Sequence, residues 1–267
     1  MAATYLDKIL AAHREAAAAD QRPLVELVAQ AEASDTPRGF RRALVDAAAD
    51  GHMAVIAEVK RRSPSKGDLA TGLDPAVLAG SYAAGGAAAL SVLTDVDFFG
   101  GSPSDLAAAR SATALPVLRK DFTVDERDVC DARIMGADAV LLIAAALDDA
   151  ELGRLRDLAA HLGLDVLIEV HDEPELDRAM AVGADLIGVN QRDLVTFIVD
   201  TDRAVRMAPL MPAGVVRVAE SGVGGPHDAR MLADAGYHAV LVGESLVKSA
   251  DPAAGVAALR VVSPTAR

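Results

Sequence analysis

From Met53 onward, short apolar runs alternate with alanine-rich segments of amphipathic pattern. Short apolar runs bounded by turn residues are typical of buried strands, and apolar positions three and four residues apart are typical of helices. We expect eight strands, over residues 54–60, 88–94, 116–120, 139–144, 165–170, 185–190, 215–220 and 239–243. Alternating strands and helices with short turns predict an α/β protein with a parallel sheet.

The segments between these runs carry helix start and stop signals. An Asp or Ser before Pro, as in Asp74-Pro75 and Ser102-Pro103, is typical of a helix N-terminus. We predict further helix starts at Asp125, Asp148, Glu173 and Asp200. A glycine before the next strand is typical of a helix end in the left-handed conformation, and we expect this at Gly86, Gly136, Gly183 and Gly236.

Eight similar units favour a closed (β/α)₈ TIM barrel over the alternative, an open doubly wound sheet. Ahead of the barrel, the apolar stripe of Tyr5, Leu6, Ile9 and Leu10 predicts a helical extension, with a second helix around 37–49. We therefore divide the chain into a helical extension packed on the barrel, the barrel and a short polar tail, at 1–50, 51–260 and 261–267.

Polar side chains stand at the C-terminal ends of several predicted strands, where TIM barrels hold their active sites. Alternate strand residues share a face, so Glu58 and Lys60 emerge side by side. Burying one ion without a partner costs several kcal/mol, so a shared pocket explains these groups better than separate charges in the core. The candidate catalytic residues are Glu58, Lys60, Lys120, Glu169, Asn190, Glu220 and Ser221.

The loops after the seventh and eighth strands predict a phosphate site, because barrels commonly bind phosphate there through backbone N–H groups. Candidate ligands are Ser221, Gly222, Gly243, Glu244 and Ser245, with the Glu244 carboxylate turned away. The loop 63–67 offers the hydroxyl of Ser63 and the ammonium of Lys66 to a bound anion, although a plain solvated loop is a fair alternative.

Aromatic residues make up 3% of the chain, yet Phe99 and Phe122 stand on polar loops just past the second and third strands. An aromatic substrate ring would explain them, whereas Phe98 fits core filling equally well. The six histidines lack metal-ligand spacing, and His171-Asp172-Glu173 is typical of a loop and helix cap. With no glycine-rich nucleotide fingerprint either, we expect no metal and no cofactor.

The formal charge of −13 and the pI near 4.8 argue against a nucleic-acid partner. No basic leader precedes an apolar segment, and no run approaches the roughly 18 residues of a membrane span, so we expect a cytoplasmic protein without a membrane partner. The single cysteine, Cys130, predicts a buried thiol in a helix over 125–135. We expect a monomer or a weak homo-oligomer.

Several segments resemble the indole-3-glycerol phosphate synthase family. The first-strand segment Ile56–Gly67 carries the likeness, and it continues along nearly the whole chain in Phe98–Ser102, Arg119–Phe122, Glu169–His171, Gly188–Leu194, Ala219–Val223 and Leu241–Leu246. Gln191, where the family commonly has Asn, and Ile198, where a polar residue is usual, depart from the pattern outside the candidate catalytic set.

The resemblance implies the substrate 1-(2-carboxyphenylamino)-1-deoxyribulose 5-phosphate, a phosphorylated small molecule with an aromatic carboxylate, which cyclises with loss of CO₂ and then water. It implies Lys120 as general acid on the carbonyl oxygen and Glu169 as a group that assists dehydration. We expect Lys60 and Lys120 to share or exchange the acid role, a division that the sequence leaves open, and we expect Arg192 to act as a supplementary cation.

Two other functions remain open from the residues. A lysine Schiff-base aldolase is one, because Lys60 or Lys120 is able to attack a carbonyl. A non-catalytic barrel that binds phosphorylated sugars is the other, because a fold alone does not prove activity. The charged groups at several strand ends argue against the second alternative.

Overall fold

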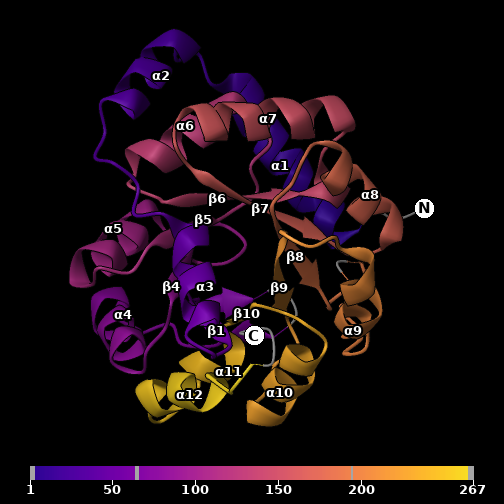
Figure 1. Ribbon diagram of the computed structural model, residues 1–267. Coiled ribbons are helices and arrows are strands. Elements are labelled where there is room, and N and C mark those ends of the chain that lie inside the picture. The colour runs from indigo at the N-terminus through magenta and orange to yellow at the C-terminus, as the bar shows by residue number, and fades with distance from the viewer. Residues whose placement is uncertain (1–3, 64–65, 194, 264–267) are drawn as a thin grey trace.

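The computed structural model describes residues 4–63, 66–193 and 195–263, in which eight parallel strands close into a barrel. The ring runs in the order β1-β10-β9-β8-β7-β6-β5-β4 (Figure 1). Its strands are β1 (Ala54–Val59), β4 (Ala89–Leu93), β5 (Val117–Lys120), β6 (Ala139–Ile143), β7 (Asp165–Val170), β8 (Leu186–Asn190), β9 (Val216–Glu220) and β10 (Ala239–Val242). The predicted TIM barrel is confirmed, with strand ends shifted by at most one residue.

Helices surround this ring (Figure 1). They are α4 (Pro75–Ala84), α5 (Pro103–Ala112), α6 (Glu126–Ile134), α7 (Asp149–His161), α8 (Glu173–Ala181), α9 (Arg203–Met207), α10 (Pro226–Asp234), α11 (Glu244–Val247) and α12 (Pro252–Leu259). Minor elements are the hairpin β2 (Arg62–Ser63) and β3 (Gly67–Asp68), and the 3₁₀ turns η1 (Ala144–Ala146) and η2 (Ala208–Leu210). Across the described part of the chain, no helix has the length and apolar character needed to cross a bilayer.

Most predicted helix signals are confirmed. The side chains of Asp74, Ser102, Asp125 and Asp148 accept N–H groups of the first helical turn. The four predicted glycines adopt φ between +77° and +91°, a region that favours residues without a Cβ. The predicted start at Glu173 is confirmed, because α8 begins at this residue with Asp172 as its N-cap. The predicted start at Asp200 is wrong, because α9 begins at Arg203 with Asp202 at the N-cap position.

The extension ahead of the barrel holds three helices, α1 (Tyr5–Ala19), α2 (Leu24–Glu32) and α3 (Phe40–Ala49). The sequence pattern predicts α1 and α3 but gives no signal for α2. No side chain caps the start of α2 at Pro23, and its buried residues Leu27 and Ala31 lie on a helix that packs against α6. Such a helix depends on tertiary packing more than on local signals.

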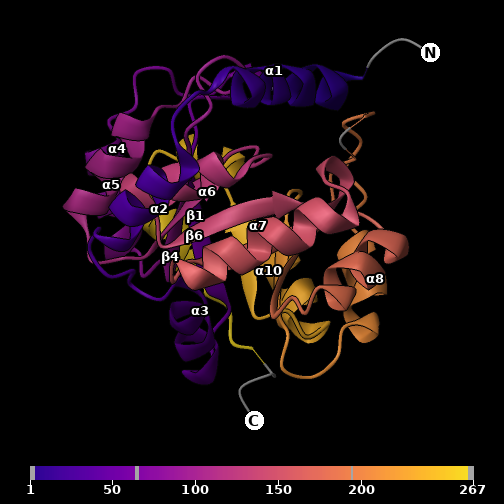
Figure 2. The same ribbon diagram turned by 90° about the horizontal axis from the view of Figure 1, so that it is seen from above.

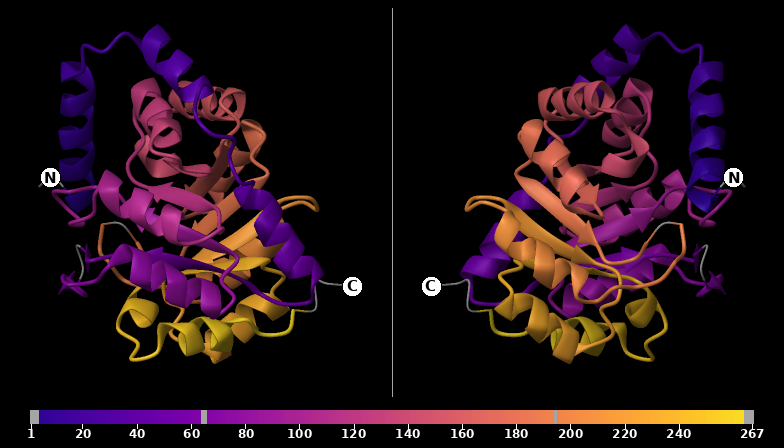
Figure 3. Two further views of the ribbon diagram at one scale, coloured as in Figure 1. Left: turned by 90° about the vertical axis from the view of Figure 1, so that its left-hand side faces the viewer. Right: turned by 90° about the vertical axis from the view of Figure 1, so that its right-hand side faces the viewer.

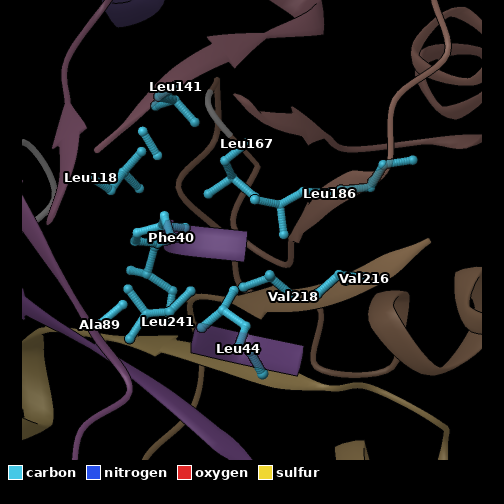
Figure 4. Packing of buried hydrophobic residues seen from close by; sticks show 14 of the residues in the cluster. Phe40, Leu44, Ala89, Leu118, Leu141, Leu167, Leu186, Val216, Val218 and Leu241 are labelled. Atoms are coloured by element: carbon cyan, nitrogen blue, oxygen red, sulfur yellow. The ribbon is translucent and has the colours of Figure 1, made fainter. Parts of the chain in front are cut away.

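Helices α1 and α3 lie at opposite ends of the barrel (Figures 2 and 3). The α3 end is the one where strands begin, because the backbone N–H groups of Arg38 and Arg41 donate to Asp138, just before β6, and to Asp165, at the start of β7. Figure 4 shows Phe40 and Leu44 of α3 among the apolar side chains of the barrel interior. Both are 0% exposed. Helix α3 therefore closes the end of the barrel where the strands begin with apolar packing. The polar residues at the C-terminal strand ends lie at the opposite end.

We predict that Leu44→Ala lowers the free energy of unfolding by about 2–5 kcal/mol, because it leaves a cavity where α3 closes the barrel. Leu210→Ala is the matched control, since Leu210 is 49% exposed and its loss changes stability by at most about 0.5 kcal/mol. Urea denaturation of the two variants measures the difference. Equal midpoints would show that α3 contributes no core packing.

Candidate active site

A cavity of about 470 Å³ opens at the C-terminal end of the barrel, and each of the eight strands contributes to its wall. All of the residues proposed above as catalytic or substrate-binding, except Lys66, line this cavity. They are Glu58, Lys60, Ser63, Phe99, Lys120, Phe122, Glu169, Asn190, Arg192, Glu220, Ser221, Gly222, Gly243, Glu244 and Ser245. Lys66 of the predicted anion-binding loop is exposed and is not part of the wall, and its neighbours 64–65 lie outside the described residues.

Lys120 is the centre of a buried charge network. Its Nζ lies 2.9 Å from Oε2 of Glu169 and 3.5 Å from Oε2 of Glu220. Asn190 Nδ2 donates to the other oxygen of Glu169 at 3.0 Å. These groups come from β5, β7, β8 and β9, so the closure of the barrel brings them together.

A second ion pair joins Lys60 Nζ to Glu58 Oε1, and Ser91 Oγ donates to Glu58 Oε2 at 3.3 Å. Gly243 leaves room for this pair, because a Cβ at that position would overlap the Glu58 carboxylate and come within 3.1 Å of Lys60 Nζ. Lys60 and Lys120 are thus each paired with a carboxylate, and either one offers an ammonium proton to the same space.

Burial and neighbouring charges shift the central pKa values in different directions. Burial would lower the pKa of Lys120, but the carboxylates of Glu169, Glu220 and Glu58 outweigh it and hold that pKa above its usual range. Burial would raise the pKa of Glu169, yet the Lys120 charge and then His171 keep that pKa low. Burial, reinforced by the negative charges of Glu169 and Glu58, raises the pKa of Glu220 to about 8.

The loops after β9 and β10 form one side of the cavity. Ser221 and Gly222 adopt left-handed backbone conformations with φ of +64° and +74°, and Ser221 is a non-glycine residue held in this unfavourable region. The carboxylate of Glu244 pairs with Lys248 Nζ at 2.8 Å. The N–H groups of Glu244 and Ser245 at the start of α11 have no acceptor within their own helix, so they are available to a ligand, whereas those of Leu246 and Val247 donate to the Gly243 carbonyl.

Aromatic side chains form the opposite part of the wall. The rings of Phe99 and Phe122 lie 6.3 Å apart, tilted by 39°. Phe98 has a different contact, packing edge-on against Tyr5 of α1 with 6.0 Å between ring centroids, and Phe197 also packs edge-on against Tyr5 at 5.7 Å. Phe98 therefore helps to hold α1 over the cavity mouth.

His13 makes contacts that were not predicted from the sequence, because its Nε2 lies 3.0 Å from Asp95 Oδ2 and 3.9 Å from Asp121 Oδ1. Potential ligand atoms of these three residues lie within 4.8 Å of one another. Both carboxylates already have partners, because Asp95 accepts backbone N–H groups and Asp121 pairs with Arg119. Burial would lower the pKa of His13, but Asp95 and Asp121 outweigh it and raise that pKa. The cluster is explained as an ion pair that fastens α1.

Asp95 and Asp121 follow the ends of β4 and β5, so the same strand-end pattern that selected Glu58 and Lys120 was able to select them. His171 was also missed as a partner of Glu169, at 3.4 Å between Nε2 and Oε1. Its position two residues beyond Glu169 was the available signal. The contact itself depends on how the chain turns after β7.

Comparison with known proteins identifies relatives along nearly the whole chain. The family model described as Indole-3-glycerol phosphate synthase matches residues 6–259. A protein of that name from a Nocardioides species is 60% identical over 203 residues, which are 76% of this chain and 78% of the relative. Another from Bordetella pertussis is 48% identical over 260 residues, which are 97% and 98% of the two chains.

Solved structures with low sequence identity share the fold. Thiamine phosphate pyrophosphorylase from Pyrococcus furiosus superposes with a TM-score of 0.58 at 16% identity, covering 79% of this chain and 95% of that one. The N-acetylmannosamine-6-phosphate 2-epimerase from Clostridium perfringens gives the same TM-score at 15% identity, covering 74% and 90%. At such identities the likeness shows the barrel fold alone.

We predict that Gly188→Ala lowers kcat by about 10²-fold, because its Cβ would overlap Glu220 Oε1 and displace this carboxyl group from Lys120. Gly80→Ala is the matched control, since a Cβ added at this position of α4 would meet no neighbouring atom within 4 Å. Turnover of the substrate implied by the family resemblance measures both variants. Unchanged kcat in a folded Gly188→Ala protein would show that the position of Glu220 is not critical.

Proposed function

This chain belongs to the indole-3-glycerol phosphate synthase family, carboxy-lyases of tryptophan biosynthesis that act on a small phosphorylated substrate, and we propose how its own residues perform the reaction. The proposed substrate is 1-(2-carboxyphenylamino)-1-deoxyribulose 5-phosphate. The observation that carries the proposal is the ammonium of Lys120 held between Glu169 and Glu220 inside the cavity. In the proposed reaction this substrate loses CO₂ and water beside Lys120 and becomes indole-3-glycerol phosphate.

Substrate orientation follows from the two sides of the cavity. The phosphate binds at Ser221, Gly222, Gly243, Glu244 and Ser245, where Glu244 contributes its N–H and its carboxylate stays with Lys248. The aromatic ring lies against Phe99 and Phe122, and Ser63 and Arg192 supply further polar contacts. The substrate carbonyl then lies between these ends, near the lysines.

Ring closure requires a proton on the carbonyl oxygen as the ring carbon that bears the carboxylate attacks the carbonyl carbon. Lys120 supplies this proton, because the surrounding carboxylates keep it protonated until the carbonyl becomes basic. Glu58, Lys60, Asn190 and Glu220 hold the charge network around the reacting atoms. Cleavage of the bond to the carboxylate releases CO₂ and restores the aromatic ring.

Dehydration completes the indole. Glu169, which its low pKa keeps ionised, accepts a proton from the carbon bonded to the ring nitrogen, while the new hydroxyl group takes a proton from Lys60 or Lys120 and leaves as water. Lys60 is close enough to the same space to share the acid role with Lys120. The proposed mechanism uses side chains alone.

We also propose the surroundings in which this reaction takes place. The enzyme acts in the cytoplasm as a monomer or a weak homo-oligomer, and its formal charge of −13 disfavours nucleic-acid binding. Residues 1–50 act as an extension packed on the barrel of residues 51–260, with 261–267 as a tail whose residues 264–267 lie outside the described structure.

We predict that Lys120→Met lowers kcat by at least about 10²-fold, the usual loss for a positioned general acid. Indole fluorescence follows the product directly, because the chain contains no Trp. Lys8→Met, on the exposed face of α1, is the matched control and retains activity. Near-normal turnover of folded Lys120→Met would remove Lys120 from the mechanism, and a larger loss in Lys60→Met would assign the acid role to Lys60.

We predict that Glu169→Gln reduces kcat more than it raises KM. Glutamine keeps the shape of the side chain but accepts no proton, so the loss falls on a chemical step and not on substrate binding. Steady-state kinetics with the same substrate separates the two parameters. A change confined to KM would assign Glu169 to binding.

A further inference from the structure

His171 lies directly behind Glu169 and is not part of the cavity wall. It follows the last residue of β7, and its Nε2 lies 3.4 Å from Glu169 Oε1. Its Nδ1 lies 3.0 Å from Glu175 Oε2 on α8. The side chain is only 11% exposed. The imidazole therefore links a carboxylate that lines the cavity to one that does not.

The orientation of this imidazole is fixed from the helix side. Oε2 of Glu175 accepts the backbone N–H of His171 at 2.8 Å as well as facing its ring. Glu175 stands in the first turn of α8, where its own N–H donates to the N-cap Asp172 at 2.9 Å. The start of α8 thus holds Nε2 of His171 toward Glu169.

Both ring nitrogens of His171 face carboxylate oxygens. A neutral imidazole has one N–H, so only the protonated ring is able to donate toward Glu169 and Glu175 together. Burial would lower the pKa of His171, but Glu169 and Glu175 outweigh it and raise that pKa to about 9. A third carboxyl group, Glu220 of β9, also interacts electrostatically with His171.

A second cation beside Glu169, the protonated His171, would stabilise the Glu169 carboxylate during turnover. While Lys120 is protonated, its charge stabilises the Glu169 carboxylate across 2.9 Å. Once Lys120 has given its proton to the substrate, that stabilisation is lost in a buried site that also contains Glu220 and Glu58. A buried carboxylate without a neighbouring cation favours its protonated form, which is unable to act as a base.

We propose that His171 is a positioning residue which, as a cation anchored by Glu175, fixes the Glu169 carboxylate and keeps it ionised after Lys120 has donated its proton. The inference rests on the roles proposed above for Lys120 and Glu169. It adds a residue that touches neither the substrate nor the cavity and acts through Glu169 alone.

The test is the pH dependence of kcat in His171→Gln, which keeps a polar side chain and removes the charge. At pH 7.5 we expect kcat to fall by about ten-fold with KM changed by less than about two-fold, because the binding contacts are intact. The acid limb of the kcat profile should move up by about 1 pH unit, since Glu169 loses a neighbouring cation.

The ratio of the wild-type kcat to the His171→Gln kcat should also depend on pH, and it should fall as the pH rises. Because the folded-state pKa of His171 is raised above 6.5, its positive charge is fully present at low pH and is lost as the pH rises through about 9. The ratio of wild-type to His171→Gln kcat should therefore decline toward one above that pH.

Two further variants complete the experiment. Glu175→Gln leaves His171 in place but removes its anchoring charge, so His171 should lose its proton at a lower pH. The kcat advantage that His171 provides over His171→Gln should therefore disappear at a lower pH in the Glu175→Gln protein than in the wild-type protein. This variant also tests the proposal if His171→Gln fails to fold. His161→Gln is the matched control, because His161 is also 3.0 Å from a glutamate, Glu32, but its side chain is 61% exposed. Its kinetics should equal those of the wild type.

A folded His171→Gln protein with wild-type kcat and an unmoved acid limb would overturn the proposal. A lower kcat with an unmoved acid limb would overturn it too, because it would indicate a structural role. Loss of activity in Glu169→Gln beside wild-type behaviour in His171→Gln would reject His171 alone. An active Glu169→Gln protein would instead remove the role of Glu169 on which the inference rests.

Discussion

The ion pair between Lys120 and Glu169 lies in the barrel mouth, where each charge depends on the other because Glu169 is buried and the Lys120 side chain is only 15% exposed. An unpaired ion there would cost several kcal/mol and would shift its pKa until it became neutral. The pair resists this because Glu220 adds a second oxygen near Lys120, while Asn190 and His171 contact the far oxygen of Glu169. The chemistry of the cavity follows from this balance.

The N-terminal extension covers both ends of the barrel that holds this ion pair. At the strand starts, Phe40 and Leu44 fill the interior, so apolar packing closes one end. At the strand ends, α1 lies over the mouth, where Tyr5 contacts Phe98 and Phe197 and His13 pairs with Asp95. The ring of His13 also lies 5.5 Å from Phe122 in the cavity wall. One segment of chain thus encloses a site built by eight strands.

Much of this structure follows from local patterns. Short apolar runs located the strands, and glycines with positive φ located the helix ends at Gly86 and Gly136, because both signals act within a few residues. The cavity residues could be selected because they stand at or just beyond the C-terminal ends of predicted strands, and parallel strands in a barrel place all these ends on one face. Helix α2 was not predicted from the sequence because it has no capping side chain and depends on packing against α6.

The sequence by itself determined the barrel, the face that carries the site and the residue types there, because periodicity and strand polarity are local properties of the chain. Tertiary structure alone decided which of those groups meet. His13 and Asp95 are 82 residues apart, and Lys120 and Glu169 are 49 apart, so no spacing links them. Gly188 leaves space for Glu220 only once β8 lies beside β9. These contacts depend on the register in which the barrel closes, and that register is a property of all eight strands together.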